Sequence, residues 1–215
     1  MTLKQLAASI AAGASTLEQD LSGAETAQLT ALISELQRWG ARVNLTAIRA
    51  PQEMVSAHIL DSLSVRPFVE GSRVIDVGTG AGFPGLPLAI VQPETAFWLL
   101  DSNGKKISFV NHVIGQLGIS NAQTVKARAE DYAPGKRFDT VIARALASTE
   151  KLLQLAGHLV REDGVLLALK GKHPAAELEA IEHLPGWAYS VTELTVPGLE
   201  SHARHVIQLR RTAAQ

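Results

Sequence analysis

The amino-acid sequence predicts an α/β fold in which a mostly parallel seven-stranded sheet ends in an antiparallel hairpin and follows a helical N-terminal extension. After Pro67, strand-like apolar segments alternate with helical patterns, and such alternation implies a parallel sheet covered by helices on both faces. Two strand-like segments lie close together near the C-terminus, whereas the pattern before Pro67 is helical throughout. We therefore divide the chain into a helical extension packed on the core (residues 1–66) and an α/β domain (residues 67–215).

Two helices of the extension have recognisable starts. The first begins at a capping box formed by Ser22 and Glu25, which satisfies the first free N–H groups of a helix. Its apolar face consists of Leu29, Leu32, Ile33, Leu36 and Trp39. The second helix has Pro51 in its first turn and must stop before Pro67. Its apolar residues are Met54, Val55, Ile59 and Leu63.

The α/β part supplies the strands of the sheet. Five parallel strands are expected at residues 73–77, 96–100, 122–127, 138–143 and 164–170, with helices at 85–92, 104–117, 148–158 and 174–183. The helix after Asp101 is the clearest, because Ser102 or Asn103 can cap it and Gly118 ends it. The last two strands, at 189–196 and 205–209, are separated only by residues 197–204. A link that short makes an antiparallel hairpin rather than a crossover.

Composition limits the classes of partner. Lys and Arg number 20 against 21 Asp and Glu, so nucleic-acid binding would depend on a local basic patch rather than on net charge. The chain has no cysteine, which excludes disulfides, thiolate metal sites and a cysteine nucleophile. No apolar run approaches the ~18 residues that span a membrane. The apolar stretch 6–14 follows a single lysine, Lys4, and is too alanine-rich for a secretion signal, so we expect a cytoplasmic protein.

The most informative segment runs from Val74 to Pro87 and reads V-I-D-V-G-T-G-A-G-F-P-G-L-P. A short apolar strand reaches Asp76 and then breaks into glycines at positions 78, 80, 82 and 85. A strand that ends in a glycine turn and opens a helix presents backbone N–H groups to a ligand. So many glycines are too costly for a connection without a ligand. The segment therefore predicts a nucleotide-type cofactor site.

Two cofactor classes match this segment. From Gly80 onward it satisfies the G-x-G-x-x-G dinucleotide pattern, and from Asp76 onward it satisfies D-x-G-x-G-x-G, which resembles the S-adenosylmethionine motif of methyltransferases. A loop that binds a dinucleotide pyrophosphate has the first glycine of the pattern directly after the strand, whereas here Asp76 and two other residues of the motif, Gly78 and Thr79, come before Gly80. Pro84 and Pro87 also remove N–H donors. The register favours S-adenosylmethionine, with Asp76 facing a cationic ammonium or sulfonium group. The motif residues predicted to bind it are Asp76, Gly78, Gly80 and Gly82.

Three further strand ends add candidate cofactor contacts, because ligands gather at the carboxyl ends of parallel strands. Asp101 ends the second strand, where a carboxylate can accept hydrogen bonds from ribose hydroxyls; a helix cap is the compatible alternative. Ala129 and Glu130 follow the third strand and could meet the adenine. Arg144 comes just past the fourth strand. A buried guanidinium needs a partner, so a purely structural ion pair is the alternative for this arginine.

Two sequence signatures of other methyltransferases are absent, which limits the kinds of atom that could accept the methyl group. No Asn/Asp-Pro-Pro-aromatic tetrad follows the fourth strand, and no cysteine exists to add to a pyrimidine C6. A ring nitrogen with a free lone pair, such as guanine N7, needs neither, because it attacks without prior deprotonation. An enzyme for such an acceptor mainly aligns the nucleophile, the methyl group and the leaving sulfur. We therefore expect no catalytic general acid or base.

The chain resembles the bacterial 16S ribosomal RNA guanine-N7 methyltransferases, whose older name is glucose-inhibited division protein B. The resemblance covers the chain from about residue 25 to its end and depends on a combination of short motifs. These motifs are Trp39, Asn44–Thr46, His58–Ser62, Asp76–Pro87, Leu99–Ser102 with Gly104 and Lys105, Arg144–Ala145, Leu169–Gly171 and Arg204–His205. It departs from the family at Gly40, where Asn is more usual after the tryptophan, and in its first twenty residues.

The resemblance implies a Rossmann-like class I methyltransferase fold and S-adenosylmethionine as the cofactor. It implies cofactor contacts from Gly78, Phe83, Ala129, Glu130 and Arg144. Its implied substrate is a guanine in the decoding-region loop of 16S rRNA, and the products are N7-methylguanine and S-adenosylhomocysteine. The expected partner is the small ribosomal subunit, and we expect a monomer that binds no membrane.

The substrate side is predicted from polar residues near the cofactor mouth. Asn44, His58 and Arg144 are candidates to position the acceptor, and Asp61 lies close to His58 in sequence. Five basic residues are candidates to hold RNA, namely Lys105, Arg128, Lys170, Lys172 and Arg204. For each lysine the alternative is a solvated surface charge.

Three other patterns in the sequence bear on chemistries besides methyl transfer. His58, Asp61 and Ser62 share a helix face, but without a nucleophile elbow they do not predict hydrolysis. The pairs His58/Asp61 and His202/His205 lack a third convergent ligand, so no metal is predicted. An NAD(P)-dependent oxidoreductase and a catalytically silent ribosome-assembly factor are the competing functions.

Overall fold

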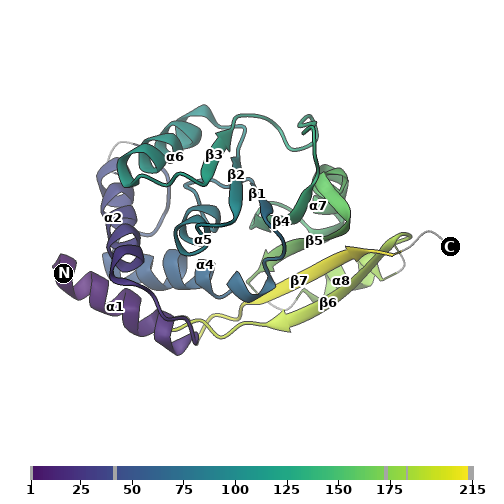
Figure 1. The fold of residues 1–215 in the computed structure, drawn as a ribbon. Helices are drawn as coiled ribbons and strands as arrows, with labels where there is room; N and C mark the ends of the chain where they lie inside the picture. Colours follow the sequence, from purple (N-terminus) through teal and green to yellow (C-terminus); the bar gives the residue numbers. More distant parts are fainter. Residues whose placement is uncertain (1, 41–42, 172–173, 183, 213–215) are drawn as a thin grey trace.

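Seven strands of the described chain form one sheet through the middle of the molecule (Figure 1). The computed structural model describes residues 2–40, 43–171, 174–182 and 184–212. The strands are β1 (Arg73–Val77), β2 (Ala96–Leu100), β3 (Ala122–Val125), β4 (Phe138–Arg144), β5 (Val160–Lys170), β6 (Trp187–Glu193) and β7 (His205–Arg211). Their order is β3-β2-β1-β4-β5-β7-β6, and β7 pairs antiparallel with both β5 and β6. The predicted sheet with its antiparallel end is confirmed.

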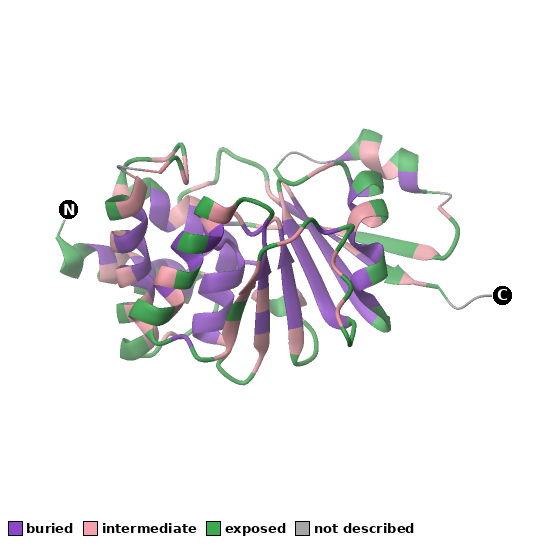
Figure 2. Ribbon diagram, turned by 90° about the horizontal axis from the view of Figure 1, so that it is seen from above, coloured by how far each residue is buried: buried purple, intermediate pink, exposed green. Residues whose placement is uncertain are grey.

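Helices cover both faces of this sheet. The longer ones are α1 (Leu3–Thr16), α2 (Gly23–Gly40), α5 (Gly85–Val91), α6 (Gly104–Leu117), α7 (Thr149–Ala156) and α8 (Ala175–Ile181). Alternate strand residues face opposite sides, so Val74 packs in a core with α1, α2, α5 and α6, whereas Ile75 packs in a second core with α7 and α8. Figure 2 shows the buried residues running along the central strands. The N-terminal helices therefore share a hydrophobic core with the sheet.

The predicted helix caps are largely present. The Ser22 N–H donates to the Glu25 carboxylate (2.7 Å) and the Glu25 N–H to the Ser22 hydroxyl (3.2 Å), as in a capping box. Asn103, rather than Ser102, caps α6, and Gly118 ends that helix with a φ of +64°.

The helix predicted from Pro51 is present but not uniform. It runs as α3 (Pro51–Met54), a π-helical segment η1 (Val55–Leu60) and α4 (Asp61–Leu63), and the short 3-10 helix η2 (Arg66–Phe68) follows. A π-turn shifts the side-chain register by one residue, and such turns are frequent at functional sites. Both His58, inside this segment, and Asp61, directly after it, are buried, at 7% and 6% exposure.

The C-terminal hairpin differs from its prediction in the length of its connection. Strand β6 ends at Glu193, so the link to β7 covers residues 194–204. The Leu194 N–H donates to the Arg204 carbonyl (2.8 Å) and closes this loop at its base. A Cβ atom on Gly198 would meet the Ser56 side chain, so the loop packs directly against η1. Elsewhere β3 ends two residues early, and β5 starts four residues early and follows the 3-10 helix η3 (Gly157–Leu159).

The alanine-rich stretch 6–14 lies in the amphipathic helix α1, with Leu6, Ile10 and Ala14 buried in the core. Across the described ranges, no helix is both long and apolar enough to cross a bilayer.

Candidate cofactor and substrate site

The glycine segment forms a tight loop between β1 and α5. Gly78, Gly80 and Gly82 have φ values of +71°, +60° and +88°, a left-handed conformation that glycine adopts without steric cost. Strand β1 has β2 on one side and β4 on the other, and this is the position in an open α/β sheet where ligands bind beyond the strand ends. The loop therefore lies where the sequence predicted a cofactor.

The loop uses most of its own N–H groups. The N–H groups of Gly78 and Thr79 donate to the Leu100 carbonyl (2.8 and 2.9 Å), and those of Gly82 and Phe83 donate to the Thr79 carbonyl (2.9 and 3.0 Å). The remaining bonds go to carboxylates: Gly80 N–H to Asp101 (3.0 Å) and Gly85 N–H to Asp76 (2.9 Å). A pyrophosphate needs free backbone donors, and this loop has already committed most of its own.

Asp76 lies beneath the loop rather than at its surface. Its Oδ2 accepts hydrogen bonds from the Thr79 hydroxyl (2.6 Å) and the Gly85 N–H (2.9 Å), and it is only 1% exposed. Burial raises the pKa of Asp76 to about 6 despite these two bonds. The geometry does not match the expectation that this carboxylate faces the cofactor's cation, because its hydrogen bonds turn it toward the loop backbone.

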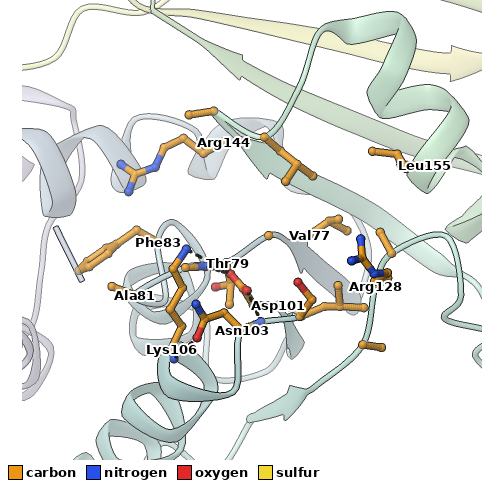
Figure 3. A pocket seen from close by; sticks show the side chains of 18 of the residues that line it. Val77, Thr79, Ala81, Phe83, Asp101, Asn103, Lys106, Arg128, Arg144 and Leu155 are labelled. Carbon is orange, nitrogen blue, oxygen red and sulfur yellow. Dashed lines mark hydrogen bonds and ion pairs between the residues drawn. The ribbon is translucent and has the colours of Figure 1, made fainter. Parts of the chain in front are cut away.

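A cavity of about 700 Å³ opens above the loop (Figure 3). It brings together most of the predicted cofactor residues from four strand ends and the N-terminal segment. The cofactor candidates that line it are Gly78, Gly80, Phe83, Asp101, Ala129, Glu130 and Arg144, whereas Asp76 and Gly82 do not. Two residues predicted for the substrate side, His58 and Arg128, line it as well. Thr46, Thr79 and Leu146 also line the cavity and were not among the predicted site residues.

Asp101 provides a carboxylate on one side of the cavity. Besides the Gly80 N–H on Oδ2, its Oδ1 accepts from the Asn103 N–H (2.8 Å), and the Lys106 ammonium lies 3.8 Å away. A carboxylate has about four acceptor positions, so this one retains capacity for ribose hydroxyls. Its predicted alternative role is taken by Asn103, which caps the helix instead.

Arg144 lies on the other side of the cavity and is tightly held. Its Nη1 donates to Asp61 Oδ2 (2.9 Å) and to the Ala57 carbonyl (3.1 Å), and its guanidinium lies 5.7 Å from the centre of the Phe83 ring. Arg204 Nε donates to the other oxygen of Asp61 (2.8 Å). The predicted need for a partner is met by Asp61, which joins β4, the N-terminal segment and the C-terminal hairpin loop.

His58 forms an aromatic wall next to these charges. Its ring stacks on Phe83 at 4.7 Å between centroids with an 18° interplanar angle, and its Nε2 lies 2.9 Å from the Thr46 hydroxyl. Burial and the positive charge of Arg144 lower the pKa of His58 to about 4. The imidazole is therefore neutral at pH 7.

A second cavity, of about 370 Å³, adjoins the first and shares His58, Arg144 and Ala145 with it. Two predicted RNA-binding residues line this second cavity. Arg204 bonds to Asp61, and the Lys170 ammonium pairs with Glu177 (2.7 Å) and donates to the Ala147 carbonyl (2.8 Å). The charge of Lys170 is thus already compensated, which weakens its candidacy as a phosphate contact.

The other substrate candidates lie elsewhere. Asn44 and Lys105 line a third cavity of about 490 Å³ beside Trp39, apart from His58 and Arg144. Arg128 is at the mouth of the first cavity, largely exposed and 4.0 Å from Glu130. Lys172 lies outside the described residues. Within the part of the chain that the structure describes, no three His, Cys, Asp or Glu side chains gather as a metal site.

Sequence comparisons with a family model and with single proteins identify the same family. The family model described as rRNA small subunit methyltransferase G matches residues 25–207. A ribosomal RNA small subunit methyltransferase G from Legionella pneumophila (strain Corby) is 49% identical over 77% of this chain and 77% of its own length. Another from Pseudomonas syringae pv. tomato is 46% identical over 99% of this chain and 100% of its own.

Structural comparison supports the same fold class. A solved S-adenosylmethionine-dependent methyltransferase from Aquifex aeolicus superposes with a TM-score of 0.56 at 19% identity, covering 83% of this chain and 97% of its own. A methyltransferase from Thiobacillus denitrificans, solved in complex with S-adenosyl-L-homocysteine, gives 0.53 at 12% identity, over 71% and 90% of the two chains. At such low identity the likeness establishes the methyltransferase fold.

Proposed function

Because the chain belongs to the rRNA small subunit methyltransferase G family, we propose that it transfers the methyl group of S-adenosylmethionine to N7 of a guanine in the decoding-region loop of small-subunit rRNA. The observation that carries this proposal is the hydrogen bonding of the glycine loop. Its N–H groups are spent on Leu100, Thr79, Asp76 and Asp101, so the loop suits an adenosine cofactor without phosphates better than NAD(P).

The residues present fit S-adenosylmethionine. Asp101 would accept hydrogen bonds from the ribose hydroxyls, and Ala129 and Glu130 lie where the adenine would be read. Gly78 leaves room for the cofactor's approach, since a side chain there would enter the cavity. When bound, the cofactor supplies a methyl group on a sulfonium, and as the N7 lone pair forms the new bond the electron pair of the broken bond goes to sulfur.

The chain's contribution to this reaction is alignment and charge. Guanine N7 needs no deprotonation, and His58, which burial keeps neutral, stacks on Phe83 as a rigid wall of the cavity. Arg144 is fixed by Asp61 and by the Ala57 carbonyl, so its guanidinium can position groups without reorganising. We assign His58 and Arg144 to positioning, and no residue to general acid or base catalysis.

The substrate partner that follows is the small ribosomal subunit or its rRNA, and we propose that the protein acts on it as a cytoplasmic monomer. Asn44 and Lys105 form a groove next to Trp39 that could take flanking RNA, and Arg204 reaches the acceptor side.

The test is methyl transfer from radiolabelled S-adenosylmethionine to small subunits, and to their deproteinised rRNA, taken from cells that lack the modification. Chain cleavage after borohydride and aniline treatment locates N7-methylguanine. Label at a single guanine in the decoding-region loop supports the proposal. No transfer to either substrate would reject the enzyme and leave the silent assembly factor.

A further inference from the structure

The second cavity has the character of a base pocket. Its volume, about 370 Å³, lies within the range of small-ligand sites, which begins near 300 Å³. Ile48, Leu169 and Leu194 provide apolar walls, and Arg204 closes it with Asp61. A nucleotide that leaves its stack is held between apolar side chains and read along its Watson–Crick edge. Because this cavity shares walls with the cofactor cavity, a base within it would lie beside the methyl donor.

Asp61 is the polar group that distinguishes this cavity. The residue is 6% exposed and lines the cavity, and each carboxylate oxygen accepts one hydrogen bond, Oδ2 from Arg144 (2.9 Å) and Oδ1 from Arg204 (2.8 Å). A carboxylate has about four acceptor positions. Among the described residues no third donor reaches it, so about one position per oxygen is left for a ligand.

Two acceptor positions side by side complement two adjacent N–H donors. Guanine presents such a pair on its Watson–Crick edge, N1–H and the N2 amino group. Adenine and cytosine place a ring acceptor there, which a carboxylate repels, and uracil places a single N–H between two carbonyls. The carboxylate of Asp61 therefore matches guanine among the four bases.

We propose that the second cavity receives the acceptor guanine with its Watson–Crick edge on Asp61, so that Asp61 determines base specificity. This inference rests on the proposed function. N7 lies across the purine from the N2 amino group, so in this orientation it points away from Asp61, which lines only the second cavity, whereas His58, Arg144 and Ala145 line both cavities.

The same contact strengthens during the reaction. As the N7–methyl bond forms and the carbon–sulfur bond breaks, the positive charge passes from sulfur to the guanine ring and no proton leaves. N1–H and the N2 amino group then become stronger donors, and charge-assisted hydrogen bonds to Asp61 tighten. An interaction that is stronger in the transition state than in the bound substrate raises kcat, so changes at Asp61 should act on kcat more than on KM.

The test combines a base analogue with an Asp61→Asn variant. Small-subunit rRNA carrying inosine at the acceptor position, made by splinted ligation and reconstituted into subunits where needed, lacks only the N2 amino group. For the unmodified protein, inosine should lower kcat/KM by about 10- to 100-fold, the range for one hydrogen bond to a charged group. In Asp61→Asn the ratio of kcat/KM for guanine to kcat/KM for inosine should fall toward one. If the role of Asp61 were purely structural, the substitution would lower kcat/KM for both substrates equally and leave the ratio unchanged.

Two controls keep the result interpretable. Asp163→Asn removes an exposed carboxylate on β5, away from both cavities, and should keep the guanine-to-inosine ratio of the unmodified protein. Leu194→Trp fills only the second cavity. It should abolish methyl transfer while leaving the Kd for S-adenosylhomocysteine, measured by calorimetry, within about twofold of the unmodified value.

The outcomes separate this inference from the proposed function. Absence of methyl transfer by the unmodified protein to any guanine substrate rejects the function. Equal kcat/KM for guanine and inosine in the unmodified protein overturns the role of Asp61, whether or not Asp61→Asn folds. Retention of the ratio in a folded Asp61→Asn protein, or full activity of Leu194→Trp, overturns the placement of the base.

Discussion

Replacement of Gly78 by valine should remove cofactor binding from a protein that still folds. Gly78 has a φ of +71°, and an L-residue in that conformation costs about 1–2 kcal/mol. For a chain of this size the melting temperature should fall by about 2–8 °C. A Cβ there would lie 2.8 Å from Leu146 Cδ1, the end of a flexible side chain that is 41% exposed. Because Gly78 and Leu146 both line the cavity, a valine side chain would take up space inside it. Forcing extra carbons into a filled site costs about 1–3 kcal/mol, equivalent to a ~5- to 150-fold loss of affinity.

Calorimetric titration with S-adenosylhomocysteine measures this loss, and Gly118→Val is the matched control. Gly118 has nearly the same φ, +64°, with nothing within 4 Å of an added Cβ, and it ends α6 away from the cavity. The control should lose similar thermal stability and keep its affinity. Normal cofactor affinity in a folded Gly78→Val protein would refute the placement of the cofactor over this loop.

Three further predictions concern single carboxylates. Asp101→Asn exchanges charged for neutral acceptors and should weaken S-adenosylhomocysteine binding about tenfold by calorimetry; unchanged binding would reject the ribose contact. Burial raises the pKa of Glu177, but hydrogen bonds from Lys170 and Thr149 lower it more, so the pKa lies below its ordinary value. The contribution of ionised Glu177 to the free energy of unfolding is complete above the unfolded pKa near 4.3 and is lost as the pH falls through the lower pKa of the folded state. In urea titrations at several pH values, Glu177→Gln should therefore lose less stability on acidification than the unmodified protein does. Burial raises the pKa of Asp76 to about 6, so the folded state binds the extra proton and stability falls as the pH rises from about 4 to 6; Asp76→Asn should lose this slope, and an unchanged slope would contradict the burial of a titrating carboxyl.

The fold was predictable where a local pattern and the tertiary packing agree. Strands β1 and β2 and helix α6 have the predicted bounds, because each apolar run ends at a residue that also ends the element, such as Gly118. The π-segment Val55–Leu60 was not predictable. Its apolar spacing fits an ordinary helix equally well, and the choice depends on packing against the hairpin loop, which is more than a hundred residues away in sequence.

The cofactor half of the site was likewise easier to predict than the acceptor half. Gly78, Asp101 and Arg144 lie at strand ends, and a parallel sheet brings strand ends together whatever the details of packing. Asp76 belongs to the same motif, yet its hydrogen bonds to Thr79 and Gly85 place it under the loop. That distinction depends on the direction of a side chain, which the spacing of glycines does not determine. Leu146 has no sequence signal, since it reaches the cavity through the left-handed Ala145, with a φ of +51°.

Asp61 shows why the acceptor half depends on the parts of the chain outside the parallel sheet. The strand ends supply Arg144, but the partner that fixes it comes from the N-terminal helices, and the second arginine comes from the loop before β7. The π-helical segment contains His58 and ends next to Asp61, and Gly198 lets the hairpin loop approach that segment. A family that shares the cofactor loop could therefore change its acceptor by changing these two additions alone. The loop between β6 and β7 supplies Arg204 and Leu194 to the second cavity and neither of them to the cofactor cavity, so its exchange should change methylation of the acceptor while cofactor affinity stays the same.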